Sequence, residues 1–309
     1  MVGLILIPIL FPAPGTLSIF VFTFWGVLFA GSWHILGRYA GQISLAHAAF
    51  FTIGGYTSTL LLIAYGLTPF LGMLIGGAIA AVMGVAIGFP SFRLRGLYFL
   101  LITLGFAEIT KVVLLRGGDV TGGPMGVHVP IGAPSLYLFR FDSVVPYYYI
   151  GLVLMCVLMV CMFWIERSKL GFYLKALRDD QDAAESLGVP VFRCKIVAAA
   201  ISCFFAAIAG TFYIQFVGYM DPADINVLRS CYAIIYSYVG GTSFLGPVIG
   251  SFVLTPLEQY LGILFGRTAP VLRQIVLGLI MIIVLLFSPE GLESKLAVVW
   301  KRLFPKHRS

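Results

Sequence analysis

The stretch ERSKLGFYLKALRDDQDAAESLGVPVFRCK, residues Glu166–Lys195, interrupts a chain that is otherwise strongly apolar. It holds eleven charged side chains. A single Lys, Arg or Asp at the centre of a bilayer costs roughly 2.5–3.5 kcal/mol. The stretch therefore lies in water or against another protein, and it divides the chain into two apolar parts.

The polar stretch also predicts a short helix with sharp ends. Asp182 begins the segment DAAESL, and Glu185 follows three positions later, which has the form of a capping box. Gly188 ends this helix and Pro190 prevents its continuation. Two interpretations remain open: an ordinary cytoplasmic loop, or a docking helix whose Ala183 and Ala184 allow a partner surface to approach closely.

The composition indicates a polytopic helical membrane protein. Hydrophobic residues make up 60% of the 309 residues, charged residues only 11%, and the mean hydropathy is +1.00. Soluble domains carry about 25% charged residues. The apolar runs approach the roughly 20 residues that cross a bilayer as a helix, and they lack the alternation of a membrane barrel. We therefore expect an all-α bundle in a single domain, residues 1–309, with a coupling loop at 166–194.

Ten apolar segments are candidate membrane spans, and some of them are short or broken. The first and eighth are the weakest, and glycines interrupt the region between Gly240 and Gly250. The segments are 1–13, 16–37, 43–64, 69–89, 97–115, 145–165, 194–218, 230–245, 248–265 and 270–288.

The distribution of charge predicts the orientation. If loop 166–194 is cytoplasmic, most of the twenty basic residues lie on the same side, so we expect both termini in the cytoplasm. The net charge of +7 is explained by this bias and not by a nucleic-acid partner. The five cysteines are scattered without metal-ligand spacing, so no metal site is expected.

Polar and glycine residues inside or beside the spans are candidates for the transport pathway. Small and polar residues belong where helices pack closely or line a cavity. For His47 an interhelical hydrogen bond is favoured over a substrate or proton role, and for Glu108 an ion pair with Lys111 is slightly favoured over a role in translocation. His47 and Glu108, with Gln42 and Ser44, are the candidates that residue type alone provides.

Two further patterns bear on packing and chemistry. Gly72, Gly76, Ala80, Gly84 and Gly88 recur every four residues, which predicts one helix face in close contact with a neighbour. The chain contains no G-x-x-x-x-G-K-[ST] motif, so it is not expected to hydrolyse ATP, and no catalytic residues are assigned.

Several segments, in this order, resemble the bacterial ABC importer permeases for branched-chain amino acids, specifically their LivM-like subunit. The resemblance covers nearly the whole chain. The segments that carry it are 37–57 (GRYAGQISLAHAAFFTIGGYT), 93–109 (RLRGLYFLLITLGFAEI), 121–127 (TGGPMGV), 170–213, 240–251 (GGTSFLGPVIGS) and 288–292 (SPEGL). The chain departs from the family pattern near residue 240, where one residue fewer is present, and after TGG, where PMGV stands.

The resemblance implies a function in an inner-membrane importer. Ala183, Ala184, Glu185 and Gly188 would form the coupling helix that sits in a groove of a partner ATPase. The resemblance also implies that Thr121, Gly122 and Gly123 lie at the outer mouth of the pathway, and that Gln42, Ser44 and His47 lie near the pathway. The expected partners are a LivH-like second permease, two ATPase subunits and a periplasmic substrate-binding protein, and ATP and Mg²⁺ would be bound by the ATPases, with no cofactor in this chain.

Other functions remain open. Related permeases carry urea, short amides or aromatic acids. From other classes, an ion-coupled secondary transporter or a membrane enzyme using Glu108, His47 or His34 as acid–base groups would need no docking helix.

Overall fold

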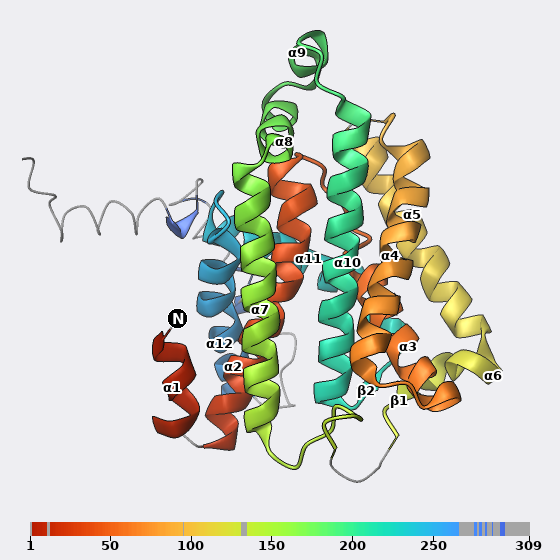
Figure 1. Ribbon diagram of the computed structural model, residues 1–309, viewed down its shortest axis with the longest axis vertical. Coiled ribbons are helices and arrows are strands. Elements are labelled where there is room, and N and C mark those ends of the chain that lie inside the picture. Colours follow the sequence, from red (N-terminus) through yellow and green to blue (C-terminus); the bar gives the residue numbers. More distant parts are fainter. Residues whose placement is uncertain are drawn as a thin grey trace, which may run out of the picture.

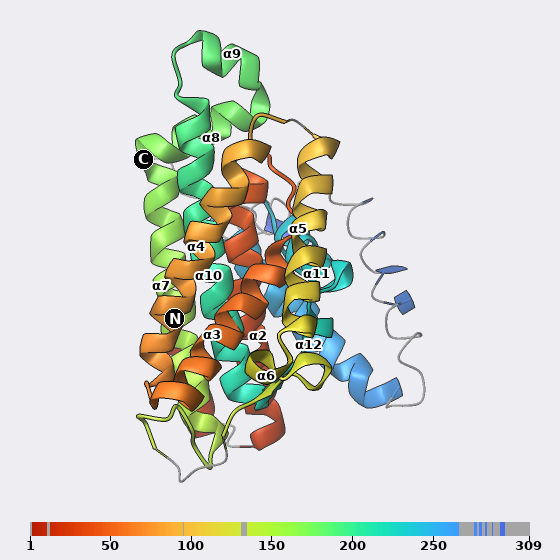
Figure 2. The same ribbon diagram turned by 90° about the vertical axis from the view of Figure 1, so that its right-hand side faces the viewer.

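The computed structural model describes residues 2–10, 13–94, 96–130 and 135–265, with 275–276, 278–279, 282, 286 and 291–293. The described chain forms an upright bundle of helices, and a pair of short helices, α8 and α9, projects from one end (Figures 1 and 2). The expected all-α bundle is therefore confirmed for these residues.

Seven helical segments are long and apolar enough to cross a membrane. The π-helix η1 (Ile35–Tyr39) continues α2 without a break, so the two form one span. The spans are α2 with η1 (Pro14–Tyr39), α3 (His47–Tyr65), α4 (Pro69–Ser91), α5 (Leu97–Arg116), α7 (Val144–Arg167), α10 (Val191–Val217) and α12 (Gly246–Phe265).

The remaining elements are short and connect the spans. They are α1 (Val2–Leu10), α6 (Gly118–Thr121), η2 (Gly123–Met125), β1 (Val127–His128), α8 (Lys169–Asp179), α9 (Gln181–Ser186), β2 (Tyr219–Met220), η3 (Pro222–Asp224) and α11 (Val227–Gly240). Strands β1 and β2 pair antiparallel, with Val127 opposite Met220. This pairing fastens the segment after α5 to the end of α10, at the end of the bundle opposite α9 (Figure 1).

The expected count of ten spans is not confirmed. In its described residues, segment 1–13 contains the nine-residue α1, and segment 230–245 overlaps the fourteen-residue α11. At 1.5 Å per residue these helices reach about 14 and 21 Å, short of the ~30 Å hydrocarbon core. Segment 270–288 lies largely outside the described residues.

The span boundaries follow from local sequence. Pro14 and Pro69 stand in the first turns of α2 and α4, where the N–H that proline lacks would have no partner within the helix. Gly66 ends α3 with a φ of 65°, a left-handed conformation that glycine adopts without strain. As predicted, the helix is interrupted after Gly240, where the turn 241–245 separates α11 from α12.

Helices α3, α4 and α10 pack closely through small residues. Gly72, Gly76, Ala80, Gly84 and Gly88 are all buried, which confirms the predicted packing face of α4. A Cβ atom at Gly72 would lie 2.7 Å from the Cα of Ser58, and one at Gly76 would lie 3.2 Å from the Cα of Gly54. The absence of side chains thus sets the distance between these helices.

Helix α2 runs through the centre of the bundle. It contacts α7, α10, α11 and α12, and its second half is buried on all sides. Large side chains such as Phe24, Phe29 and Trp33 fill the space around it. The α2 span is therefore the element around which the other spans are arranged.

We expect Gly54→Ala to destabilise the bundle. The new methyl carbon would lie 2.5 Å from the Cα of Ala207 in the middle of α10, where the backbone cannot move alone. Overpacking of this kind costs about 1–3 kcal/mol. The thermal unfolding midpoint in detergent should fall, whereas Gly15→Ala, at an open position in α2, should leave it nearly unchanged. Equal midpoints for the two variants would contradict this packing.

Candidate coupling site and transport pathway

The arm formed by α8 and α9 projects beyond the spans between α7 and α10 (Figure 1). Ser168 accepts a hydrogen bond from the N–H of Gly171 and caps α8. Asp180, between the two helices, accepts hydrogen bonds from the N–H groups of Asp182 and Ala183, at 2.9 and 3.1 Å. Each helix therefore has a defined start, and a single residue joins the two.

The predicted cap at Asp182 is wrong, because Asp180 occupies the N-cap position. Asp180 has the extended backbone (φ −154°, ψ 113°) that a cap requires, whereas Asp182 lies within the first turn of α9. The predicted end at Gly188 is confirmed. Gly188 has a φ of 83°. Its N–H bonds to the carbonyl of Glu185, and the N–H of Val189 bonds to the carbonyl of Ala184. These two bonds form a Schellman motif.

The arm presents apolar groups to solvent. Leu187 at the end of α9 is 85% exposed and Phe172 on α8 is 66% exposed. Ala183 and Glu185 are exposed too, but Ala184 is buried against the rest of the protein, so only the first alanine of the pair is available to a partner. At the base of the arm, the ammonium of Lys195 donates to the side-chain oxygen of Gln181 at 2.7 Å and ties α9 to α10.

The candidates Ser44 and His47 are both buried in contacts between helices. The Ser44 carbonyl accepts the indole N–H of Trp33 at 2.9 Å. The Nε2 of His47 lies 2.9 Å from the hydroxyl oxygen of Ser202, which in turn donates to the carbonyl of Ser32. The predicted interhelical hydrogen bond of His47 is confirmed. Gln42, in the same loop, is only partly buried.

The residues Thr121, Gly122 and Gly123 lie at the opposite end of the bundle. The Thr121 hydroxyl donates to the carbonyl of Leu114 at 2.6 Å, and Gly122 and Gly123 have φ values of 71° and 53°. They shape the turn from α6 into η2. The sequence candidates thus do not form one site, and their role in a pathway stays a prediction.

Glu108 lies on the outer, exposed side of α5. The structure forms no ion pair between Glu108 and Lys111, so the predicted pairing is wrong. On a helix face that is open in the isolated chain, such a pair gains little and loses side-chain freedom. A carboxylate in a span does not face lipid tails, so this side of α5 requires water or another protein.

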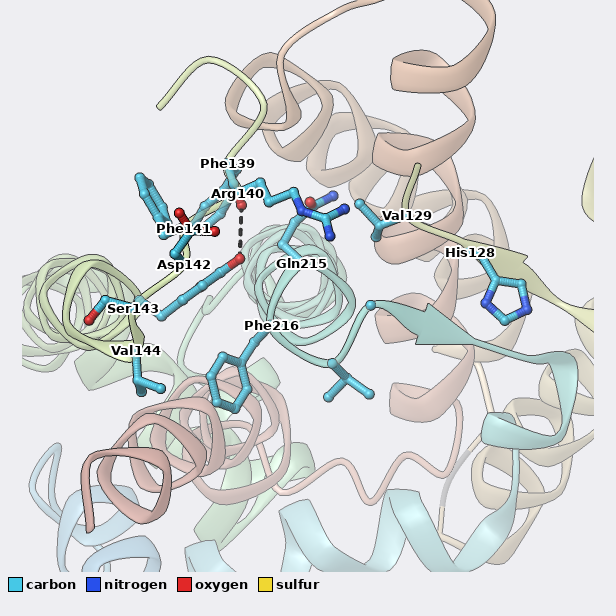
Figure 3. Close-up of a pocket in the computed structure, with 13 residues that line it drawn as sticks. His128, Val129, Phe139, Arg140, Phe141, Asp142, Ser143, Val144, Gln215 and Phe216 are labelled. Atoms are coloured by element: carbon cyan, nitrogen blue, oxygen red, sulfur yellow. Dashed lines mark hydrogen bonds between the residues drawn. The ribbon is translucent and has the colours of Figure 1, made fainter. Parts of the chain in front are cut away.

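A cavity of about 540 Å³ lies near the ends of α7 and α10, at the end of the bundle opposite α9 (Figure 3). Aromatic rings of Phe139, Phe141 and Phe216 share its wall with Arg140 and Asp142. Sequence reasoning missed this cavity, because its wall combines residues between 128 and 147 with residues 215–218, which are far apart in the sequence. Its mixture of aromatic and charged groups suits contact with a polar molecule or protein loop on that face.

Beside β2, burial raises the pKa of Asp224, while its ion pair with Arg229, at 2.7 Å, acts in the opposite direction. The Arg229 guanidinium also lies over the rings of Phe51 and Tyr213. This cluster fixes the start of α11.

Sequence similarity to known proteins identifies the family of this chain. Residues 15–285 match the family model described as branched-chain amino acid transport system / permease component. The chain belongs to this family. No solved structure matches it.

Two relatives of this permease are high-affinity branched-chain amino acid transport system permease proteins LivM. The protein of Escherichia coli K12 is 29% identical over 94% of this chain and 74% of its own length. That of Salmonella typhimurium LT2 is 30% identical over 82% of this chain and 64% of its own length. The D-allose transport system permease protein AlsC of Escherichia coli K12 is 28% identical over 73% of this chain and 69% of its own length. The permease thus spans about two thirds to three quarters of these relatives.

We expect Asp180→Ala to loosen α9. Loss of an N-cap costs about 1 kcal/mol, so backbone amides 183–187 should exchange with deuterium about fivefold faster in the purified permease. Asp179→Ala, which removes a neighbouring exposed carboxylate that bonds only to Arg178, is the matched control. Equal exchange in the two variants would show that Asp180 is not the cap.

Proposed function

We propose that this permease forms part of the translocation pathway of an ATP-driven importer for branched-chain amino acids, and that α9 docks on a partner ATPase. The observation that carries the proposal is the arm itself: a short, doubly capped helix with an exposed Leu187 beyond the membrane-spanning bundle. The family match and the two LivM relatives support the substrate class.

The arm has the properties that a lever needs. The Asp180 side chain caps α9 with two hydrogen bonds while its N–H bonds to the carbonyl of Ala176 in α8, and Lys195 links α9 to α10. A displacement at Leu187 would therefore reach the spans α7 and α10 and would not be lost in a mobile loop. ATP and Mg²⁺ belong to two partner ATPase subunits, and this chain needs no cofactor of its own.

The outer side of α5 is where we place the second permease and the pathway. Glu108 lies there without a partner among the described residues, and α5 is the least buried of the seven spans. A second, LivH-like permease against this side would remove the carboxylate from lipid and enclose a polar route. A periplasmic binding protein would deliver the substrate at the opposite end from α9, where the cavity beside Arg140 and Asp142 opens.

The orientation follows from the basic residues. At the α9 end stand Arg38, Arg93, Arg167, Lys169, Lys175, Arg178, Arg193 and Lys195. We therefore propose that this end is cytoplasmic, in a bacterial inner membrane. The cytoplasmic placement of both termini stays a prediction, since α1 is too short to cross and the carboxyl-terminal tail lies outside the described residues.

Glu185→Lys and Gly188→Pro should abolish uptake and release the ATPase at normal membrane abundance, because both alter α9 and neither touches a span. The measurement is co-purification of an ATPase encoded beside this chain, in mild detergent. Asp142→Lys, an equal charge reversal at the other end of the bundle, should retain the ATPase. Retention by both arm variants would contradict docking at α9.

The same preparation separates the alternatives. A wild-type permease that never binds an ATPase but moves substrate under an ion gradient in liposomes would be a secondary transporter. Binding of urea, a short amide or an aromatic acid by the partner binding protein, with no affinity for leucine, would change the substrate and leave the importer assignment intact.

Glu108→Gln should reduce uptake with little change in the thermal midpoint, since Glu108 forms no hydrogen bond or ion pair among the described residues. Ile109→Ala is the control, as Ile109 is exposed on the same helix but carries no charge. Uptake and thermal unfolding are measured on each variant. A fall in midpoint with unchanged uptake per molecule would assign Glu108 to stability.

A further inference from the structure

The turn 241–245, between α11 and α12, lies at the end of the bundle from which the arm projects. Its backbone N–H groups precede α12 and have no partners within that helix. Side chains satisfy three in succession: Ser243 N–H donates to Glu293, Phe244 N–H to Glu166 at 3.0 Å, and Leu245 N–H to the hydroxyl of Ser243. Two carboxylates therefore occupy the start of α12, where the helix dipole favours negative charge.

Glu166 also contacts the arm. Its Oε1 accepts a hydrogen bond from the ammonium of Lys175 on α8 at 2.9 Å, and its Oε2 lies 3.4 Å from the hydroxyl of Tyr39, the last residue of η1. One carboxylate on the last turn of α7 thus joins α8, the start of α12 and the end of the α2 span.

Aromatic contacts support the same junction. The ring of Phe244 meets that of Phe163, one turn before Glu166, edge-on at 5.4 Å, and the guanidinium of Arg167 lies 4.2 Å from the centre of the Phe163 ring. These contacts hold the turn 241–245 against α7, so that a shift of one is followed by the other.

The solvent side of this junction is open. A cavity of about 440 Å³ is bounded by Glu166, Lys175, Phe172 and the turn 243–245. The cavity leaves α8 without close packing against the turn at this point. In the present arrangement the carboxylate is the polar bridge across that space.

We infer that Glu166 is a positioning residue that transmits movement of the arm to α12 and to the α2 span. The inference rests on the proposed coupling to an ATPase, and it adds the route by which docking at α9 reaches the membrane. The bridge runs from the ammonium of Lys175 on the arm, through the Glu166 carboxylate, to the N–H of Phe244 in the bundle.

The test is uptake per ATP hydrolysed, measured in liposomes that contain the permeases, their ATPases and the binding protein. In Glu166→Gln the amide oxygen still accepts the Phe244 N–H but the ion pair is lost, and Lys175→Met removes the same pair from the partly exposed arm. Each variant should lower the ratio about tenfold, the scale of one lost charge-assisted hydrogen bond, with the ATPases still bound.

The double variant distinguishes a shared bridge from two separate effects. If Glu166 and Lys175 act through one contact, the double variant should be no worse than either single one. Asp179→Asn, which breaks the exposed pair with Arg178 on the same arm, should leave the ratio unchanged.

Three outcomes would overturn the inference and leave docking at α9 intact. They are a normal ratio in Lys175→Met, effects that multiply in the double variant, and an equal loss in Asp179→Asn. A wild-type assembly that shows no ATP-driven uptake would instead overturn the proposed function, and this inference with it. Because Lys175 is outside the core, its variant decides the question even where Glu166→Gln fails to fold.

Discussion

A helix that ends inside a membrane protein leaves backbone N–H and C=O groups that water does not reach, and other parts of the chain must satisfy them. The loop 40–46 shows how this constraint organises the bundle. The N–H of Leu45 bonds to the hydroxyl of Thr103 on α5, its carbonyl accepts from Ser230 on α11, and Ser230 also caps the N–H of Ala48. This one non-helical loop thus joins the α2–α3 junction to α5 and α11.

The bundle consequently contains regions of different rigidity. Helices α3, α4 and α10 approach so closely at Gly54 and Gly76 that they can move only together. Helix α5 makes few contacts with the rest of the described chain, and its exposed side carries Glu108. A transporter needs both kinds of region, because a rigid body can transmit a displacement and only a loosely held element can open a path. Glu166, at the end of α7, contacts both the arm, through Lys175, and the start of α12, through the N–H of Phe244.

Sequence reasoning succeeded where one residue type has one physical use. The glycines of α4, the stop at Gly188 and the break after Gly240 all follow from the missing Cβ atom or from left-handed backbone, and the structure confirms them. It failed where the outcome depends on geometry. Asp180 and Asp182 are equally good caps by composition, and only the backbone angles decide between them. Likewise, Glu108 and Lys111 share a spacing that permits an ion pair, yet the two side chains form none. The two weakest span candidates, 1–13 and 230–245, overlap α1 and α11, which are too short to cross the hydrocarbon core.

Many residues in the segments that resemble the family hold helices together or shape turns. Ser44 and His47 are buried in bonds to neighbouring helices, and Gly122 supplies a left-handed turn. Substituting such residues would disturb the scaffold whatever the cargo, which is consistent with similarity to both amino-acid and D-allose permeases. We expect selectivity to depend on side chains that make no such bonds among the described residues, and Glu108 on α5 is one of them. We therefore expect discrimination among substrates on the open side of α5 and at the outer cavity.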